Sequence, residues 1–152
     1  MRISAKADYA VRAALELAST EQSGPVTTEA LATSQDIPRK FLEAILNDLR
    51  RAGLVVGVRG SGGGYRLRLP ATEVTVADVV RAVDGPLVSV RDARPPELEY
   101  SGSAEPLLEL WIALRASVRS VLETVTLADL ASGRLPEQVH LLAGPAEAWD
   151  NP

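Results

Sequence analysis

The sequence predicts a mainly α-helical protein with one small β-hairpin, and three observations support this prediction. Several separate stretches show apolar residues at the spacing of an amphipathic helix. Two short strand-like runs flank a glycine-rich segment at residues 60–64. An apolar stretch at residues 107–125 has the alternating spacing of four and three residues that is typical of a helix–helix seam. The expected fold is therefore a winged helix-turn-helix followed by a long dimerisation helix.

A chain of 152 residues has room for one domain, or for a small domain with an oligomerisation element. No apolar run approaches the roughly 20 residues that span a bilayer, and the N-terminal residues lack the apolar core of a secretory signal. We therefore expect a cytoplasmic protein without membrane contacts. There is no cysteine, and the one histidine, His140, cannot form a metal site alone, so neither a metal nor another cofactor is expected.

The charge changes sign along the chain. Residues 1–70 contain ten Lys and Arg against seven Asp and Glu, whereas residues 71–152 contain six against thirteen. Residues 36–70 alone contain seven basic and three acidic side chains, so the local field attracts a polyanion. The overall abundance of arginine is an alternative explanation, and composition alone supports both equally.

The first two helices are expected at residues 4–20 and from Thr27 or Thr28 to about Ser34. Ser4 and the two threonines are residue types that cap helix N-termini. Residues 35–38 form a tight turn, and Pro38 suits the start of the next helix because its missing amide hydrogen would be unpaired there. Two helices joined by about four residues are typical of a helix-turn-helix. The buried stripe expected of the first helix contains Ala10, Ala13, Ala14, Leu17 and Ala18.

A third helix is expected from Pro38 to about Ala52, with one apolar and one polar face. In a helix that enters the major groove, residues near the N-terminus reach the edges of the base pairs. An ordinary solvent-exposed helix face is the alternative, and it is the commoner fate of such charges. The expected buried residues are Leu42, Ile45, Leu46 and Leu49, and the expected DNA contacts are Arg39, Lys40, Glu43 and Asn47.

The hairpin is expected to consist of strands at residues 54–58 and 65–69, the first of them buried. From Tyr65 to Leu69 apolar residues alternate with arginines, so one face of the second strand is apolar and the other basic. Glycines at the tip let the backbone approach a sugar-phosphate chain closely. A nucleotide-binding loop is a poor alternative because no Lys-Ser or Lys-Thr follows the glycines and no helix comes next. The expected wing contacts with DNA are Arg59, Gly60, Gly62, Gly63, Tyr65 and Arg66.

A fourth helix is expected after the capping box at residues 75–78, and Gly85-Pro86 ends it. Its expected buried residues are Val76, Val79, Val80 and Val83. The following residues, 87–104, are expected to form a loop.

Pro106 begins the last long helix, which is apolar on two sides. Such a helix must pack against its own domain and a second partner, and a copy of itself in a two-fold dimer is the simplest one. A purely intramolecular helix is the alternative. The residues expected at the dimer interface are Leu107, Trp111, Leu114, Val118, Val121 and Val125.

A second capping box, at residues 126–129, begins a short final helix that Gly133 ends. Beyond Pro136 there is little pattern, and a mobile tail is expected. The predicted organisation is a winged helix-turn-helix DNA-binding domain at 1–86, a loop at 87–104, the dimerisation helix and short last helix at 105–133, and the tail at 134–152.

Four stretches carry a family likeness: MRISAKADYAVRAALELA, IPRKFLEAILNDLRRAGLVVGVRGSGGGYRL, TVADVVRAVDGPL and TLADLA. With them the chain resembles the Rrf2 family of bacterial regulators, which includes an iron–sulfur cluster regulator, a nitric-oxide-sensitive repressor and a cysteine-metabolism repressor. This resemblance covers residues 1–87 in order and 105–133 more loosely. It implies a homodimeric transcription factor that binds an inverted repeat in double-stranded DNA, with residues 38–52 in the major groove and the wing in the minor groove.

The chain departs from the family pattern in two places. Ala44 stands where some members carry a polar side chain that can contact a base, so the resemblance implies an operator that differs or is less tightly specified. The loop at 87–104, where iron–sulfur members place their cluster ligands, contains no cysteine, and its carboxylates Asp92, Glu97 and Glu99 would not hold a cluster.

The expected function is therefore a dimeric transcriptional repressor controlled by a small molecule, with the expected binding site near Trp111. Control by a protein partner that docks on the acidic C-terminal half is the alternative. An enzymatic function is the least supported interpretation, because no potential catalytic nucleophile has an identifiable general base.

Overall fold

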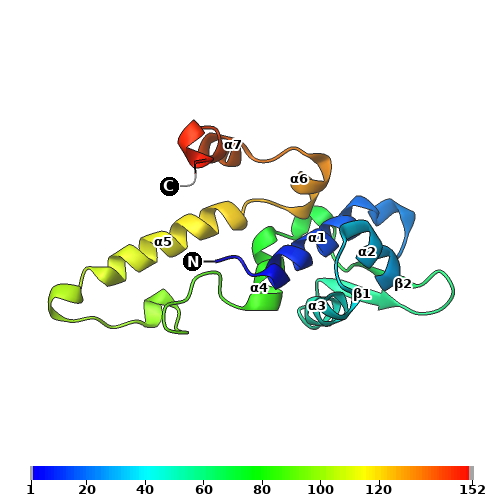
Figure 1. The fold of residues 1–152 in the computed structure, drawn as a ribbon, viewed down its shortest axis with the longest axis horizontal. Helices are drawn as coiled ribbons and strands as arrows, with labels where there is room; N and C mark the ends of the chain where they lie inside the picture. Colours follow the sequence, from blue (N-terminus) through cyan, green and yellow to red (C-terminus); the bar gives the residue numbers. More distant parts are fainter. Residues whose placement is uncertain (1, 151–152) are drawn as a thin grey trace.

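The computed structural model describes residues 2–150 and contains helices and a single two-stranded antiparallel sheet (Figure 1). This confirms the predicted fold class. The helices are α1 (Ala5–Ser19), α2 (Thr28–Gln35), α3 (Arg39–Arg51), α4 (Val76–Asp84), α5 (Leu107–Leu122), α6 (Leu127–Ser132) and α7 (Glu137–Ala143), and the strands are β1 (Val55–Val58) and β2 (Gly64–Leu67).

Helix α1 lies at the centre of the body and contacts α2, α3, α4 and α6. The Ser4 hydroxyl caps it by accepting a hydrogen bond from the Ala7 amide at 2.9 Å. The whole predicted stripe of α1 is buried, and four of its five members are alanines. Small side chains let neighbouring helices approach closely, which explains how one short helix can pack against four others.

The turn between α2 and α3 contains Asp36, whose backbone is left-handed at φ 50° and ψ 51°. The next amide, that of Ile37, donates to the Ala32 carbonyl at 3.0 Å and ends α2. The Ile37 side chain is buried, and Pro38 directly precedes α3. Helix α3 then buries Leu42, Ile45, Leu46 and Leu49 completely, as predicted.

The hairpin pairs Val55 with Leu67 and Val58 with Gly64. Tyr65 also exchanges two backbone hydrogen bonds, of 2.7 and 2.8 Å, with Val26 in the connection between α1 and α2. A Cβ atom on Gly64 would lie 2.3 Å from the Val26 carbonyl oxygen, so this close approach requires glycine. The wing is thus fastened to the body at its base.

Two predictions about the hairpin are wrong. Leu69 lies beyond β2 and is exposed, and only Val55 of β1 is buried, while Val58 is exposed. The cause is that the hairpin projects from the body (Figure 1), so residues toward its tip have no layer to pack against.

Helix α4 has its predicted capping box, in which Thr75 and Asp78 bond reciprocally. Its buried residues are Ala77, Val79 and Val80, so the expectation that Val76 and Val83 are fully buried is wrong. These two valines are half-buried because the buried face of α4 centres on Ala77, which packs completely.

Residues 124–127 return from α5 to the body. The Val76 amide donates to the Val125 carbonyl, and the Leu127 amide donates to the Val74 carbonyl, both at 2.9 Å. The prediction that the long helix continues to Val125 is wrong, because α5 ends at Leu122. Val125 is only 6% exposed within the subunit, which leaves little of its side chain for the predicted dimer interface. Its side chain packs within the subunit, and α6 packs against α1.

Residues 87–104 form a loop, as expected, with single turns of 3-10 helix at Pro95–Glu97 and Gly102–Ala104. Its side chains Val88, Pro95 and Leu98 are buried, and the turn at Pro95–Glu97 contacts α5. Helix α5 extends away from the body (Figure 1), and none of its residues is buried.

Helix α7 forms beyond Pro136, where the sequence has little pattern. Its side chains Leu141 and Leu142 are exposed, as is Trp149. The mobility of this tail stays a prediction. No helix within residues 2–150 combines the length and apolarity needed to cross a membrane.

Candidate nucleic-acid interface

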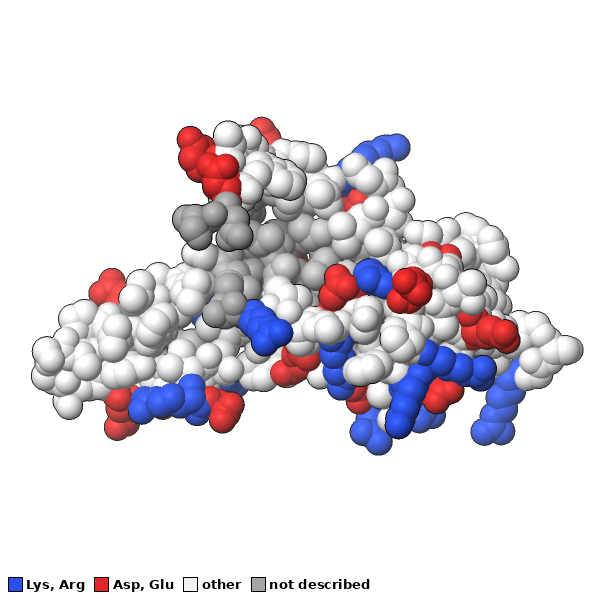
Figure 2. Space-filling model, in the orientation of Figure 1, with Lys and Arg blue, Asp and Glu red and all other residues white. Residues whose placement is uncertain are grey.

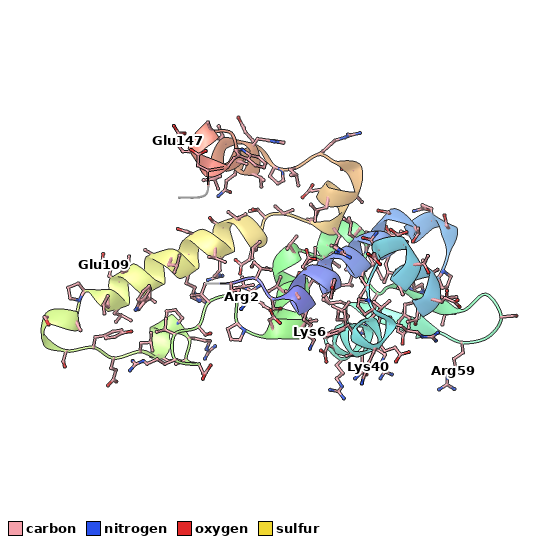
Figure 3. All side chains as sticks on the ribbon, viewed as in Figure 1. Arg2, Lys6, Lys40, Arg59, Glu109 and Glu147 are labelled. Carbon is pink, nitrogen blue, oxygen red and sulfur yellow. The ribbon has the colours of Figure 1, made fainter. Side chains whose placement is uncertain are left out.

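Lys and Arg side chains project from one edge of the molecule, beneath α3 and the hairpin (Figure 2). Lys40 in the first turn of α3 and Arg59 in the wing both point away from the body on this side (Figure 3). The structure therefore brings together the two segments in which the sequence placed its DNA contacts. The hydrogen bonds and ion pairs of these side chains within the protein determine which of them remain available to contact a ligand.

The first turn of α3 carries an exposed ion pair. The Arg39 Nε donates to Glu43 Oε1 at 3.2 Å, and the two side chains are 65% and 58% exposed. Pairs of this kind contribute only about 0.3–0.5 kcal/mol, so both groups can exchange partners when a ligand arrives. Lys40 beside them is exposed and makes no ion pair within residues 2–150.

The second half of α3 is more constrained. Asn47 is half-buried, and its Oδ1 accepts from Arg50 Nη2 at 3.0 Å. Asp48 pairs with Lys6 of α1, with 2.6 Å between Nζ and Oδ2. This ion pair neutralises the charge of Asp48 and joins α3 to α1.

The sequence did not indicate a role for Phe41, which is 56% exposed on α3. Its ring meets that of Tyr9 edge to face, with centroids 6.2 Å apart, and the Arg12 guanidinium lies 5.1 Å from the Tyr9 centroid. The sequence signal that could have identified Phe41 as a surface residue is its position outside the apolar stripe of α3. Arg50 and Arg51 were likewise left out of the predicted contacts although both are exposed.

The wing tip turns on glycines. Gly60 and Gly62 have positive φ values of 99° and 77° and face open space, whereas a Cβ on Gly63 would lie 2.2 Å from the Val58 carbonyl oxygen. Gly63 thus closes the turn, and its amide donates to the Gly60 carbonyl at 3.0 Å. Arg59 is exposed and makes no side-chain hydrogen bond or ion pair within residues 2–150.

The two remaining wing residues behave differently. Tyr65 is half-buried and packs against the core. Arg66 is exposed, although its Nη1 also donates to the Leu67 carbonyl at 3.2 Å. Arg66 therefore remains available on the surface, whereas the Tyr65 ring serves mainly to support the hairpin.

A groove of about 600 Å³ lies between the end of α3 and the hairpin. It has arginines on both sides, Arg50 from α3 and Arg59 from the wing. A concave surface with cationic walls suits a sugar-phosphate backbone. Its lining residues are Arg50, Val56, Gly57, Val58, Arg59, Gly64 and Tyr65.

Two of the residues predicted at the dimer interface, Trp111 and Leu114, line a second hollow, of about 530 Å³. The rest of its wall comes from residues 2–4 just before α1, from the second half of α4 and from residues 86–90. The Trp111 Nε1 donates to the Tyr100 hydroxyl at 3.1 Å. Leu107 is exposed, and Val118 and Val121 are half-buried.

No group of three or more His, Asp or Glu side chains within residues 2–150 is arranged to hold a metal ion. The whole chain lacks cysteine. Thiolates are the ligands that iron–sulfur clusters require, so the residues present do not fit such a cluster.

Comparison with known proteins agrees with this fold. A family model described as Rrf2, iron-dependent transcriptional regulator, matches residues 3–133. A Mycobacterium tuberculosis protein whose name places it among the HTH-type transcriptional regulators is 52% identical over 151 residues, covering 99% of this chain and 94% of that protein. The HTH-type transcriptional regulator CymR of Bacillus subtilis is 36% identical over 133 residues, covering 87% and 91%.

Solved structures give the same result. The structure of CymR, described as the global cysteine regulator of B. subtilis, has a TM-score of 0.75 at 35% identity and covers 88% of this chain and 98% of that one. IscR from T. potens has a TM-score of 0.71 at 31% identity and covers 88% of each chain. These relatives are transcriptional regulators and not enzymes.

Proposed function

Because this chain belongs to the Rrf2 family of transcriptional regulators, we propose that it is a homodimeric repressor that binds an inverted repeat of double-stranded DNA in the cytoplasm. Its control, in this proposal, is by a small molecule and not by an iron–sulfur cluster. The observation that carries the DNA contact is that α3 and the wing present one basic face, from which Lys40 and Arg59 project together (Figure 3).

In this proposal the N-terminal half of α3 enters the major groove, and the wing lies along the minor groove. Arg39, Lys40 and Glu43 face the base edges, because residues early in a recognition helix reach the bases, and Asn47 lies one turn further along the same helix. Arg59 enters the minor groove, and Arg66 contacts phosphate. Gly60 and Gly62 allow close approach, while Gly63 and Tyr65 hold the wing in shape.

The proposed dimer forms through α5, along Leu107, Trp111, Leu114, Val118 and Val121. It is supported by the absence of any buried residue on α5 within its own subunit, where Leu110 is 55% exposed. A second copy related by a two-fold axis would cover these side chains. Binding to an inverted repeat would require the two α3 helices of the dimer to lie about 34 Å apart, one turn of DNA.

The proposed effector site is the hollow beside Trp111, because its volume is in the range of small-molecule sites and its walls come from both the body and α5. Tryptophan fluorescence during titration with a panel of metabolites tests this proposal. If no compound changes both the emission and the affinity for DNA, control by a small molecule at this position is rejected.

A selection of genomic DNA fragments bound by the purified protein tests the main proposal. We expect recovery of a short inverted repeat that the protein binds at nanomolar concentration in about 0.15 M salt. Recovery of unrelated fragments in proportion to their length would show that the protein does not recognise sequence.

A second candidate is control by a protein partner on the acidic C-terminal half. The observation that favours it is α7, where Leu141 and Leu142 are exposed beside Glu137. This segment lies beyond the residues that the family model matches. Affinity capture from cell extract, with a chain truncated after Gly133 as control, tests it, and the absence of any stoichiometric partner specific to the full chain counts against it.

A further inference from the structure

Three arginines converge on a small hollow outside the DNA-binding face. Arg81 of α4, Arg94 of the loop and Arg115 of α5 line a space of about 300 Å³, which the backbone turn at Gly85, Pro86 and Leu87 completes. Like charges repel, so three guanidinium groups gather around one space only where negative charge balances them. The partners of each arginine therefore decide what the hollow can bind.

Arg81 and Arg94 are partly neutralised within the chain. Arg81 Nη2 bonds to Glu123, a carboxylate that Arg119 shares through its Nε at 2.8 Å. Arg94 uses its Nε and Nη2 to bond Glu97. A guanidinium has five N–H donors, so donors remain on both side chains.

Arg115 is the unbalanced group. It is half-buried and makes no ion pair or side-chain hydrogen bond within residues 2–150. The three arginines around the hollow are thus balanced by only two carboxylates, Glu97 and Glu123. Glu123 also pairs with a fourth arginine, Arg119. This local excess of positive charge lies in residues 71–152, where acidic side chains outnumber basic ones by thirteen to six.

We propose that this three-arginine hollow binds a small oxyanion, a phosphate or a carboxylate, and that its occupancy changes the affinity of the protein for DNA. Planar guanidinium groups match both oxyanions through paired N–H donors. Bound there, the anion would join α4, the loop and α5. Helix α4 packs against α3, so the position of the recognition helix can respond. Pro86 and Leu87 also line the hollow beside Trp111, which places the two spaces next to each other.

Calorimetric titration with inorganic phosphate and, separately, with succinate at constant ionic strength tests the binding step on the full chain without DNA. We expect at least one of them to bind once per subunit. Arg115→Gln and Arg94→Gln should each weaken that binding about ten-fold or more, since each removes charge-assisted hydrogen bonds. The matched control is Arg134→Gln, an exposed arginine between α6 and α7, which should bind as the wild type does.

The two probes distinguish a phosphate site from a carboxylate site. No binding of either, or equal binding by all four proteins, overturns the proposal; equal binding would point to the basic face of α3 and the wing instead. Using both Arg94→Gln and Arg115→Gln keeps the test decisive if one of them folds poorly.

The regulatory step rests on the proposed DNA-binding function and is measured separately, by fluorescence anisotropy on the selected operator with and without the bound oxyanion. We expect a change of about five-fold or more in affinity for the wild type and none for Arg115→Gln. An unchanged wild-type affinity overturns the regulatory step. A protein that binds oxyanion but no DNA overturns the proposed function and leaves the binding site in place.

Discussion

Single residues at the wing decide whether the hairpin can form, and the glycines there have different roles. Gly64 lies against the backbone of Val26, whereas Gly62 faces open space. The sequence identified a glycine-rich tip, but it could not show that one glycine meets a segment almost forty positions earlier in the chain. That contact depends on how the body folds and leaves no local pattern.

Replacing Gly64 with alanine should lower the free energy of unfolding by about 3 kcal/mol, because the new methyl group would meet the Val26 carbonyl at 2.3 Å and break the backbone pairing with Tyr65. Gly62→Ala is the matched control and should lower it by about 1 kcal/mol, since only its positive φ of 77° is strained. Urea denaturation measures both values. Equal losses would contradict the close approach at Gly64.

The charged residues at the interface should separate into two classes. Arg59→Ala should weaken binding to all DNA sequences and reduce the salt slope by about one, because it removes a cation that lies in the minor groove between two phosphate chains in the proposed complex. Lys40→Ala should instead change sequence preference, by about 1–3 kcal/mol at a contacted base pair. Anisotropy titrations at several salt concentrations, with Arg134→Ala as a control, measure both. Unchanged binding in both variants would refute the proposed placement of α3 and the wing.

Helices could be predicted well where caps and periodicity agree. The Thr75 and Thr126 capping boxes begin α4 and α6, and the completely buried stripe of α3 has the predicted members. Predictions failed where the partner of a segment lies far away in sequence. Val125 continues the apolar spacing of α5, yet its carbonyl accepts a hydrogen bond from the Val76 amide in the body. The reason is that the Thr126 cap and Gly133 define a separate short helix, α6, which docks on the body.

The basic face of α3 and the wing could be expected from the sequence because the two segments are near each other in the chain. Lys40 and Arg59 project on the same side of the molecule (Figure 3), and their contact with DNA stays a prediction. The sequence predicted a site near Trp111, but it could not show what lines either hollow. Both combine α4, the loop and α5, and the hollow beside Trp111 also includes residues 2–4, more than a hundred positions before Leu114.

The link between α4 and α5 should make stability depend on pH. Hydrogen bonds from Arg119 and then Arg81 lower the pKa of Glu123 from 4.5 to about 2. A carboxylate whose pKa is depressed on folding contributes its stability above its unfolded pKa, and this contribution is lost as the pH falls from about 4.5 toward 2. Glu123→Gln should therefore be less stable than the wild type at pH 7, and the difference should shrink as the pH falls through this range.

Thermal unfolding of both proteins between pH 2 and pH 7 measures that difference. Glu109→Gln, at an acidic residue of α5 without an ion pair within residues 2–150, is the control and should show no such trend. A constant difference between Glu123→Gln and the wild type at all pH values would contradict the ion-pair link.

At the scale of the whole molecule, the extended α5 accounts for the shape seen in Figure 1 and underlies the proposed dimer. Val118→Asp should place a charge in the proposed seam and weaken dimerisation at least ten-fold. Ser117→Asp, one position along on an exposed side of α5, is the matched control. Sedimentation at several concentrations measures both, and a fully dimeric Val118→Asp protein would exclude this side of α5 from the interface.

The return of residues 124–127 to the body has a consequence for folding. The hydrogen bond between Val76 and Val125 closes a loop of about 50 residues, and the entropic cost of closure grows with loop length. Contacts between distant segments form slowly. A polypeptide emerging from the ribosome can therefore assemble α1 to α4 early, but the docking site of Leu127 stays open until residues 124–127 have also been synthesised.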